Sequence, residues 1–116
     1  MFDKLKDLGG LMQQAQQMQQ KIKELQEQLG QREIVGSSGA GMVKVTVNGR
    51  MEVVRVRLSD EAARLNDREM LEDLIKAAAN QAVEKARQLV AEETAKMATG
   101  LGLPPGVNLP GLPGLT

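Results

Sequence analysis

Apolar residues recur at alternating steps of three and four along the first third of the chain. They are Leu8, Leu11, Ala15, Met18, Ile22, Leu25 and Leu29. Because Gln, Lys and Glu fill most of the positions between them, this heptad spacing predicts one long amphipathic helix that ends at Gly30. The spacing leaves open whether the stripe packs on the rest of this chain or on a second copy.

Apolar and polar residues alternate from Val43 to Leu58, on both sides of Asn48-Gly49. The alternation predicts a β-hairpin, and Asn-Gly favours a two-residue type I′ turn that would place Val43 opposite Val54. One face of this hairpin is predicted to form the core, and it carries Val43, Val45, Val47, Val54, Val56 and Leu58. The opposite face carries Lys44, Thr46, Arg55 and Arg57 together with Met42, Met51 and Val53.

A further extended piece begins at Glu33 and is followed by a Gly- and Ser-rich bend, GSSGAG. The simplest arrangement is a three-stranded antiparallel sheet, whose exposed edges a second copy would protect. The bend lacks the GK[ST] ending of a phosphate-binding loop, and no helix follows it, which argues against a nucleotide site.

A second long helix is predicted from about Asn66 to Thr99. Asn66 and Glu69 have the spacing of a capping box, and the acidic residues that follow suit a helix start. After Gly100 the sequence becomes LGLPPGVNLPGLPGLT, which holds all four prolines and no charge. We therefore predict a folded domain of residues 1–99 and a flexible Pro/Gly/Leu-rich tail of residues 100–116. The predicted fold class is α+β, with two long helices flanking the small sheet.

The composition argues against most enzyme classes. The 116 residues include no cysteine and no histidine, so thiolate nucleophiles, the commonest metal ligand and the usual general base are missing. We expect no catalytic residues, no metal and no cofactor. The single aromatic residue, Phe2, provides neither a stacking platform for unpaired bases nor an aromatic-lined pocket for a small-molecule substrate. No stretch approaches the roughly 18 apolar residues of a membrane span, so we expect a cytoplasmic protein without a membrane partner.

The net charge is zero, but it is unevenly distributed. Residues 1–33 hold five basic and five acidic side chains, residues 34–60 hold four and two, and residues 61–116 hold six and eight. The small positive excess therefore falls on the hairpin region, where a polyanion would be attracted.

Four stretches occur in a fixed order between about Leu11 and Gly106. They are LMQQAQQMQQKIKELQEQL, GSSGAGMVKVTVNGRMEVVRVRL, DREMLEDLIKAAANQAVEKA and GLGLPPG. Together they resemble the YbaB/EbfC family of small bacterial nucleoid-associated DNA-binding proteins. The resemblance implies a homodimer whose helices project like the arms of tweezers, with double-stranded DNA between or along them. It also implies binding with little sequence preference, association with the nucleoid, and a role in chromosome organisation or gene regulation.

Two sets of basic residues are candidates for DNA contacts. The sheet set is Lys44, Arg55 and Arg57, and the helical set is Lys21, Lys23, Arg32, Lys85 and Arg87. The tweezer arrangement favours the helical set and the local charge excess favours the sheet set, so both stay open. Met42, Met51 and Val53 are the candidates for the dimer contact.

The sequence leaves two alternatives open. RNA stays open as a partner, because phosphate contacts do not separate the two polymers. A protein–protein scaffold that acts through the helical stripe and the Leu/Pro tail is the alternative function.

Overall fold

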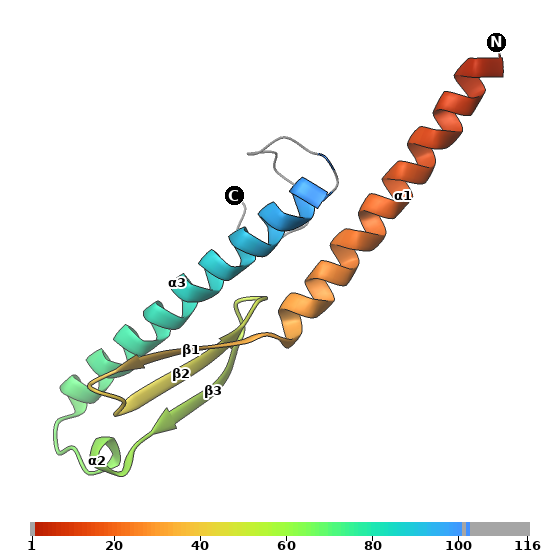
Figure 1. The fold of residues 1–116 in the computed structure, drawn as a ribbon. Helices are drawn as coiled ribbons and strands as arrows, with labels where there is room; N and C mark the ends of the chain where they lie inside the picture. The colour runs from red at the N-terminus through yellow and green to blue at the C-terminus, as the bar shows by residue number, and fades with distance from the viewer. Residues whose placement is uncertain (1, 101, 103–116) are drawn as a thin grey trace.

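The computed structural model describes residues 2–100 and residue 102, with side chains described from Leu8 onward. The elements are α1 (Phe2–Gln31), β1 (Glu33–Ser38), β2 (Val43–Asn48), β3 (Val53–Leu58), α2 (Asp60–Ala63) and α3 (Arg68–Gly100). The predicted order of a helix, three antiparallel strands and a long helix is confirmed. In Figure 1, α1 leaves the sheet as a long arm, and the last turns of α3 project beyond the sheet in the same general direction.

The sheet has the strand order β1-β2-β3, and α3 packs mainly on β1 and β2. The core lies between them, and its buried members are Val43, Val45, Val47, Ala62, Ala78, Ala82 and Ala86. Alanines let the α3 backbone come very close to the sheet, and glycine on β1 completes the fit. A Cβ atom added at Gly36 would lie 2.9 Å from the Cα of Ala82, and closer still to the Ala78 carbonyl oxygen and the Ala82 nitrogen.

The predicted type I′ turn is wrong. The hairpin loop is longer, because the Asn48 side-chain oxygen accepts hydrogen bonds from the N–H groups of Arg50 (2.9 Å) and Glu52 (3.1 Å). Met51, and not the Asn-Gly pair, takes the positive φ of 63°. Gly49 serves another purpose, since its N–H donates to the carbonyl of Leu29 at 2.8 Å and a Cβ atom there would collide with α1.

The longer loop shifts the register of β3 by four residues. Val43 pairs with Leu58 and Val45 pairs with Val56, with a bulge opposite Thr46 and Val47. Because four is an even number, the side chains from Arg55 to Leu58 still lie on the predicted faces of the sheet, whereas beyond the bulge Val53, which was predicted for the opposite face, pairs with the buried Val47. Between Arg55 and Leu58 only the cross-strand partners differ from the prediction.

The predicted burial of β3 is also wrong. Val56 and Leu58 pair with the buried Val45 and Val43 of β2, and Val54 lies at the bulge, but the three are 49%, 44% and 45% exposed. The physical reason is that α3 covers β1 and β2 and leaves this edge strand open. We call Val54, Val56 and Leu58 the apolar row.

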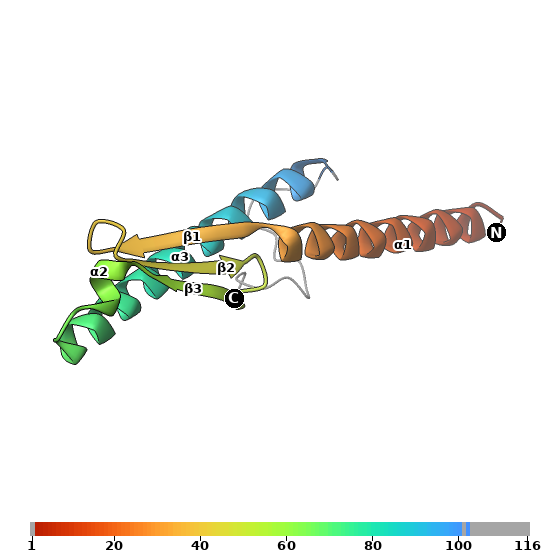
Figure 2. The ribbon, with the colours of Figure 1, turned by 90° about the horizontal axis from the view of Figure 1, so that it is seen from below.

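The stripe on α1 is buried only at its C-terminal end. Leu25 and Leu29 pack with Val90 of α3, whereas Leu8 and Leu11 are 56% and 61% exposed. Figure 2 shows the reason, because the two helices diverge as they leave the sheet. The stripe therefore packs partly on the protein's own α3. The helix continues without a break through Gly9 and Gly10 and past the predicted end at Gly30.

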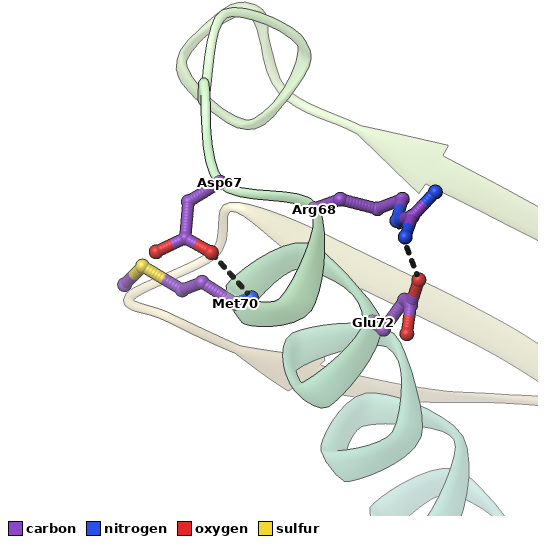
Figure 3. Close-up of polar contacts among 4 residues, drawn as sticks. All are labelled: Asp67, Arg68, Met70 and Glu72. Atoms are coloured by element: carbon purple, nitrogen blue, oxygen red, sulfur yellow. Dashed lines mark hydrogen bonds and ion pairs between the residues drawn. The ribbon is translucent and has the colours of Figure 1, made fainter.

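Two helix starts differ from the predictions. The short helix α2 was not expected, and the Ser59 hydroxyl caps it by accepting from the Ala62 N–H at 3.1 Å. The long helix α3 is capped by Asp67 instead of Asn66, since a carboxylate oxygen of Asp67 accepts from the Met70 N–H at 3.0 Å (Figure 3). An acidic cap suits the partial positive charge of a helix N-terminus.

Most of the predicted tail lies outside the described residues. Of residues 100–116, Gly100 ends α3 and Gly102 forms a turn. The division into residues 1–99 and residues 100–116 stays a prediction.

Candidate nucleic-acid interface

The sheet set lies on the face of the sheet opposite α3. Lys44 on β2 pairs directly with Arg57 on β3, and Thr46 pairs with Arg55. On the other side of β2, Ser37 of β1 pairs with Lys44. We call this surface the outer face and define it by Ser37, Lys44, Thr46, Arg55 and Arg57. Within the described part of the chain no helix packs across it, and all but Thr46 are exposed.

One residue of the outer face has an acidic partner. The Arg55 guanidinium lies 3.6 Å from a carboxylate oxygen of Glu33, with side-chain exposures of 45% and 52%. Such an exposed pair contributes little to stability and opens readily. Lys44 and Arg57 have no ion pair with a carboxylate among residues 8–100, so two adjacent cations remain unneutralised.

The helical set is scattered over separate surfaces. Lys21 lines a groove between α1 and α3 together with Glu24, Glu93 and Lys96. Lys23 lines a shallow hollow along α1 beside the carboxylates of Glu24 and Glu27. Acidic side chains accompany both lysines.

The remaining helical candidates are exposed and lie apart from these two lysines. Arg32 connects α1 to β1, and Arg87 lies on α3. The Lys85 ammonium is 3.4 Å from the Val35 carbonyl oxygen, to which it donates. The structure thus gathers the sheet set on one face and leaves the helical set dispersed.

Comparison with known proteins agrees with the fold described above. A sequence model of the YbaB/EbfC DNA-binding family matches residues 4–101, which is most of the chain. The chain belongs to this family. Its fold is similar to the crystal structure of HP0035, an uncharacterized protein from Helicobacter pylori, with a TM-score of 0.65 and 26% sequence identity. That match covers 78% of this chain and 91% of HP0035.

Membership of the YbaB/EbfC family confirms the resemblance drawn from the four sequence stretches. It places the chain in a DNA-binding class, and the confirmed fold agrees with it. Neither comparison assigns a role to a particular residue.

The three predicted dimer residues occupy different environments in this YbaB/EbfC protein. Met42 packs partly against the core beneath α3, and Met51 packs against both hydrophobic clusters. Val53 is 57% exposed at the start of β3. The sequence missed the apolar row as a candidate interface, because alternation identifies a face of a sheet but not whether a helix covers it.

Arg50 is the basic residue whose position the sequence did not suggest. It lies at the hairpin tip over Gly30, where an added Cβ atom would be 2.7 Å from the Arg50 Nε atom. A cation near the C-terminal end of a helix is favoured by the helix dipole.

The described residues contain no group of three or more Asp, Glu, His or Cys side chains that could hold a metal ion. Within the same part of the chain, no helix combines the length and hydropathy needed to cross a bilayer.

Proposed function

We propose that the protein is a nucleoid-associated protein that binds double-stranded DNA as a homodimer with little sequence preference. The observation that carries this proposal is the family match over residues 4–101. The exposed basic residues of the sheet and of the two long helices support it. On this proposal the protein contributes to chromosome organisation in the nucleoid and, through it, to gene regulation.

The proposed mechanism is electrostatic. Lysine and arginine side chains contact phosphates and displace condensed counterions, which gives affinity that falls steeply with salt. Phosphate contacts orient a protein on the duplex but carry no base sequence, so weak sequence preference follows. Three contacts from each chain would give about six in a dimer, and a slope of log affinity against log salt of roughly −5.

The apolar row supports the proposed homodimer. Val54, Val56 and Leu58 extend the buried core to an open sheet edge, and about half of each side chain remains exposed. Exposed aliphatic residues that continue a core, on an unprotected edge strand, are typical of surfaces that another chain covers. A second copy offers the same row, so the two can cover each other around a twofold axis. We propose this row, with the adjacent Val53, as the dimer contact, and assign Met42 and Met51 to the packing of the single chain.

A lysine substitution in the apolar row tests the dimer. Val56→Lys should convert the dimer to a monomer, because the interface would have to bury an unpaired ammonium. Val35→Lys is the matched control, since Val35 is 46% exposed on β1 and points to the outer face. Light scattering coupled to size-exclusion chromatography gives the mass. A monomeric wild-type protein, or two variants that both stay dimeric, would contradict the proposed contact.

DNA binding is tested with the purified full chain and fluorescent duplexes of unrelated sequence, over about 50 to 200 mM salt. We expect similar affinities for all sequences and a steep loss of affinity with salt. An equal series with duplex RNA measures the preference between the two polymers. Absence of DNA binding at the lowest salt would refute the proposed function.

A second candidate function, a scaffold for other proteins, is favoured by the free part of α1. Leu8, Leu11 and Met12 are 56%, 61% and 67% exposed along the arm. Substituting Leu8 and Leu11 by glutamine separates the two functions. A DNA-binding protein should keep its affinity for duplex in this variant, whereas a scaffold should lose its protein partners and show no duplex affinity to begin with.

A further inference from the structure

The two edges of the sheet differ in how their main-chain groups are bonded. On each edge strand, β1 and β3, alternate residues point their N–H and C=O groups away from β2. On β1, two of these groups are bonded by side chains of α3. The Ser37 N–H donates to the side-chain oxygen of Gln81 at 2.7 Å, and the Lys85 ammonium donates to the Val35 carbonyl oxygen at 3.4 Å. We call Gln81 and Lys85 the edge pair.

The edge pair matches β1 in both spacing and chemistry. Its members are four residues apart, so they lie on the same side of α3, about 6 Å apart along the helix. Val35 and Ser37 are two residues apart on β1, which separates them by about 6.6 to 6.8 Å along the same edge. A glutamine oxygen faces the donor of the strand, and a lysine ammonium faces its acceptor.

The close approach of α3 brings these side chains to the edge. A strand residue without a Cβ atom, Gly36, lies directly against the backbone of Ala78 and Ala82. A further link comes from the Ser38 hydroxyl, which donates to the Leu74 carbonyl oxygen. The helix is thus held along β1, and its exposed edge pair can reach the main chain of the strand.

The opposite edge is different. Among residues 8–100, no side chain forms a hydrogen bond to the main chain of β3 in this way. The helix α3 packs mainly on β1 and β2, so its side chains serve one edge only. Unbonded edge groups are a template for a strand of another chain, and proteins usually protect them. The fold therefore protects the β1 edge and leaves the β3 edge, beside the apolar row, open.

We infer that the edge pair closes β1 against strand pairing with another copy, so that each chain offers a partner only the β3 side of its sheet. A second copy could pair with β1 only by taking the two positions that Gln81 and Lys85 occupy. It would also have to displace a lysine ammonium from an edge strand, where lysine is a common protection against pairing. The limit of two copies rests on the homodimer proposed above, whereas the closed edge follows from the contacts within one chain.

A closed β1 edge decides what kind of assembly the protein forms. Contact on the β3 side can be symmetric, and a twofold axis then ends the assembly at two copies. A second contact through β1 would join one dimer to the next, and repetition of both contacts produces an open chain of dimers. The edge pair thus determines assembly size, although it lies on the side of the sheet away from the proposed dimer contact.

The test removes the edge pair by Gln81→Ala with Lys85→Ala. Alanine is the best helix former, so α3 should be retained. The matched control is Lys76→Ala with Gln88→Ala, which removes the same residue types and the same charge from exposed positions of α3. Light scattering coupled to size-exclusion chromatography measures the mass of each full-length protein from about 10 μM to about 1 mM.

We expect the mass of the double variant to rise with concentration to about twice that of the wild type or more, because the first product is a pair of dimers. The wild type and the control should keep a constant mass. Gln81→Glu with Lys85→Arg retains an acceptor and a donor at the same positions, so this variant should also keep the mass of the wild type.

A cysteine reports whether the larger species form through β1. The chain has no cysteine, and Val35 is 46% exposed near the middle of β1. Symmetric antiparallel pairing of two β1 strands brings the two copies of this position within the range of a disulfide. Val35→Cys added to the double variant should therefore give disulfide-linked pairs of chains, and Val35→Cys added to the control should not.

Four results would overturn the inference. They are an unchanged mass of the double variant, equal growth of the control, growth without the disulfide, and a wild type that already forms larger species through β1. If circular dichroism shows that the double variant is unfolded, Lys85→Ala alone carries the test, and an unchanged mass there overturns the inference. A monomeric wild type would refute the proposed dimer instead. The inference would then require the double variant to form disulfide-linked pairs from that monomer.

Discussion

Gly36 on β1 offers the most direct test of how α3 packs on the sheet. The perturbation is the smallest available, Gly36→Ala, which adds one methyl group between the strand and the helix. That methyl carbon would lie 2.9 Å from the Cα atom of Ala82 and closer to two further backbone atoms of α3. Neither the strand nor the helix backbone can rotate away as a side chain would.

The expected cost follows from these distances. Carbon atoms are optimally separated by about 3.5 to 4.0 Å, so α3 must move outward by at least about 0.6 Å. A displacement of this size forfeits between a quarter and a half of the contact energy along the interface. The buried alanines Ala78, Ala82 and Ala86 all lie on this interface. We expect a loss of about 3 kcal/mol, at the upper end of the range for overpacked cores.

The assay is urea unfolding followed by far-ultraviolet circular dichroism at one fixed protein concentration, since the proposed dimer would couple stability to concentration. With a denaturant dependence of about 1 to 3 kcal/mol per molar urea, the midpoint should fall by about 1 to 3 M. Gly9→Ala is the matched control, because nothing lies within 4 Å of an added Cβ atom there. In the interior of α1 this change should stabilise the helix by about 0.5 to 1 kcal/mol. An unchanged midpoint for Gly36→Ala would refute the close approach of α3 to β1.

Three further predictions concern local contacts. Gly49→Ala should destabilise the protein by about 1 to 3 kcal/mol, because the new methyl group would lie 2.7 Å from the Cβ atom of Leu29. An unchanged urea midpoint would contradict the docking of the hairpin on α1. Asn48→Ala should lower the free energy of unfolding by about 1 to 3 kcal/mol, since the N–H groups of Arg50 and Glu52 lose their acceptor. Hydrogen exchange at these two amides should accelerate. Asp67→Ala should lower the free energy of unfolding by about 1 kcal/mol, because the cap on α3 is lost. Alanine in place of the exposed Arg68 is the control and should change it by less than about 0.5 kcal/mol. Equal thermal midpoints for the two variants would contradict the capping role of Asp67.

The element order was predictable because it depends on local patterns. Heptad spacing and strict alternation each extend over more than ten residues, and no tertiary contact is needed to interpret them. The turn at Asn48-Gly49 was not predictable from the same pattern. In the observed loop the Asn48 side chain accepts two hydrogen bonds and the Gly49 N–H donates to the Leu29 carbonyl, a long-range contact that a local pattern does not contain. The last turn of α1 thus contributes to the geometry of a loop whose Gly49 lies twenty residues beyond Leu29 along the chain.

The candidate site was predictable in its members but not in its arrangement. Alternation placed Lys44, Arg55 and Arg57 on one face, and the even register shift preserved that assignment. The predicted register put Lys44 opposite Val53, so the unneutralised pair of Lys44 and Arg57 did not appear in it. The pairing of Lys44 with Arg57 follows from the length of the hairpin loop. That loop is in turn held against the last turn of α1. The charge excess in residues 34–60 was the one sequence signal that pointed to the same surface.

The uneven roles of β2 and β3 follow from where α3 lies. On β2, alternate side chains are buried beneath α3, and Val43, Val45 and Val47 are 0 to 1% exposed. On β3 the matching side chains stay about half exposed, because the helix does not reach the edge. A strand with an apolar row on one side and cations on the other is poorly explained by the stability of a single chain. The exposed apolar row is the feature that the proposed contact between two copies would cover.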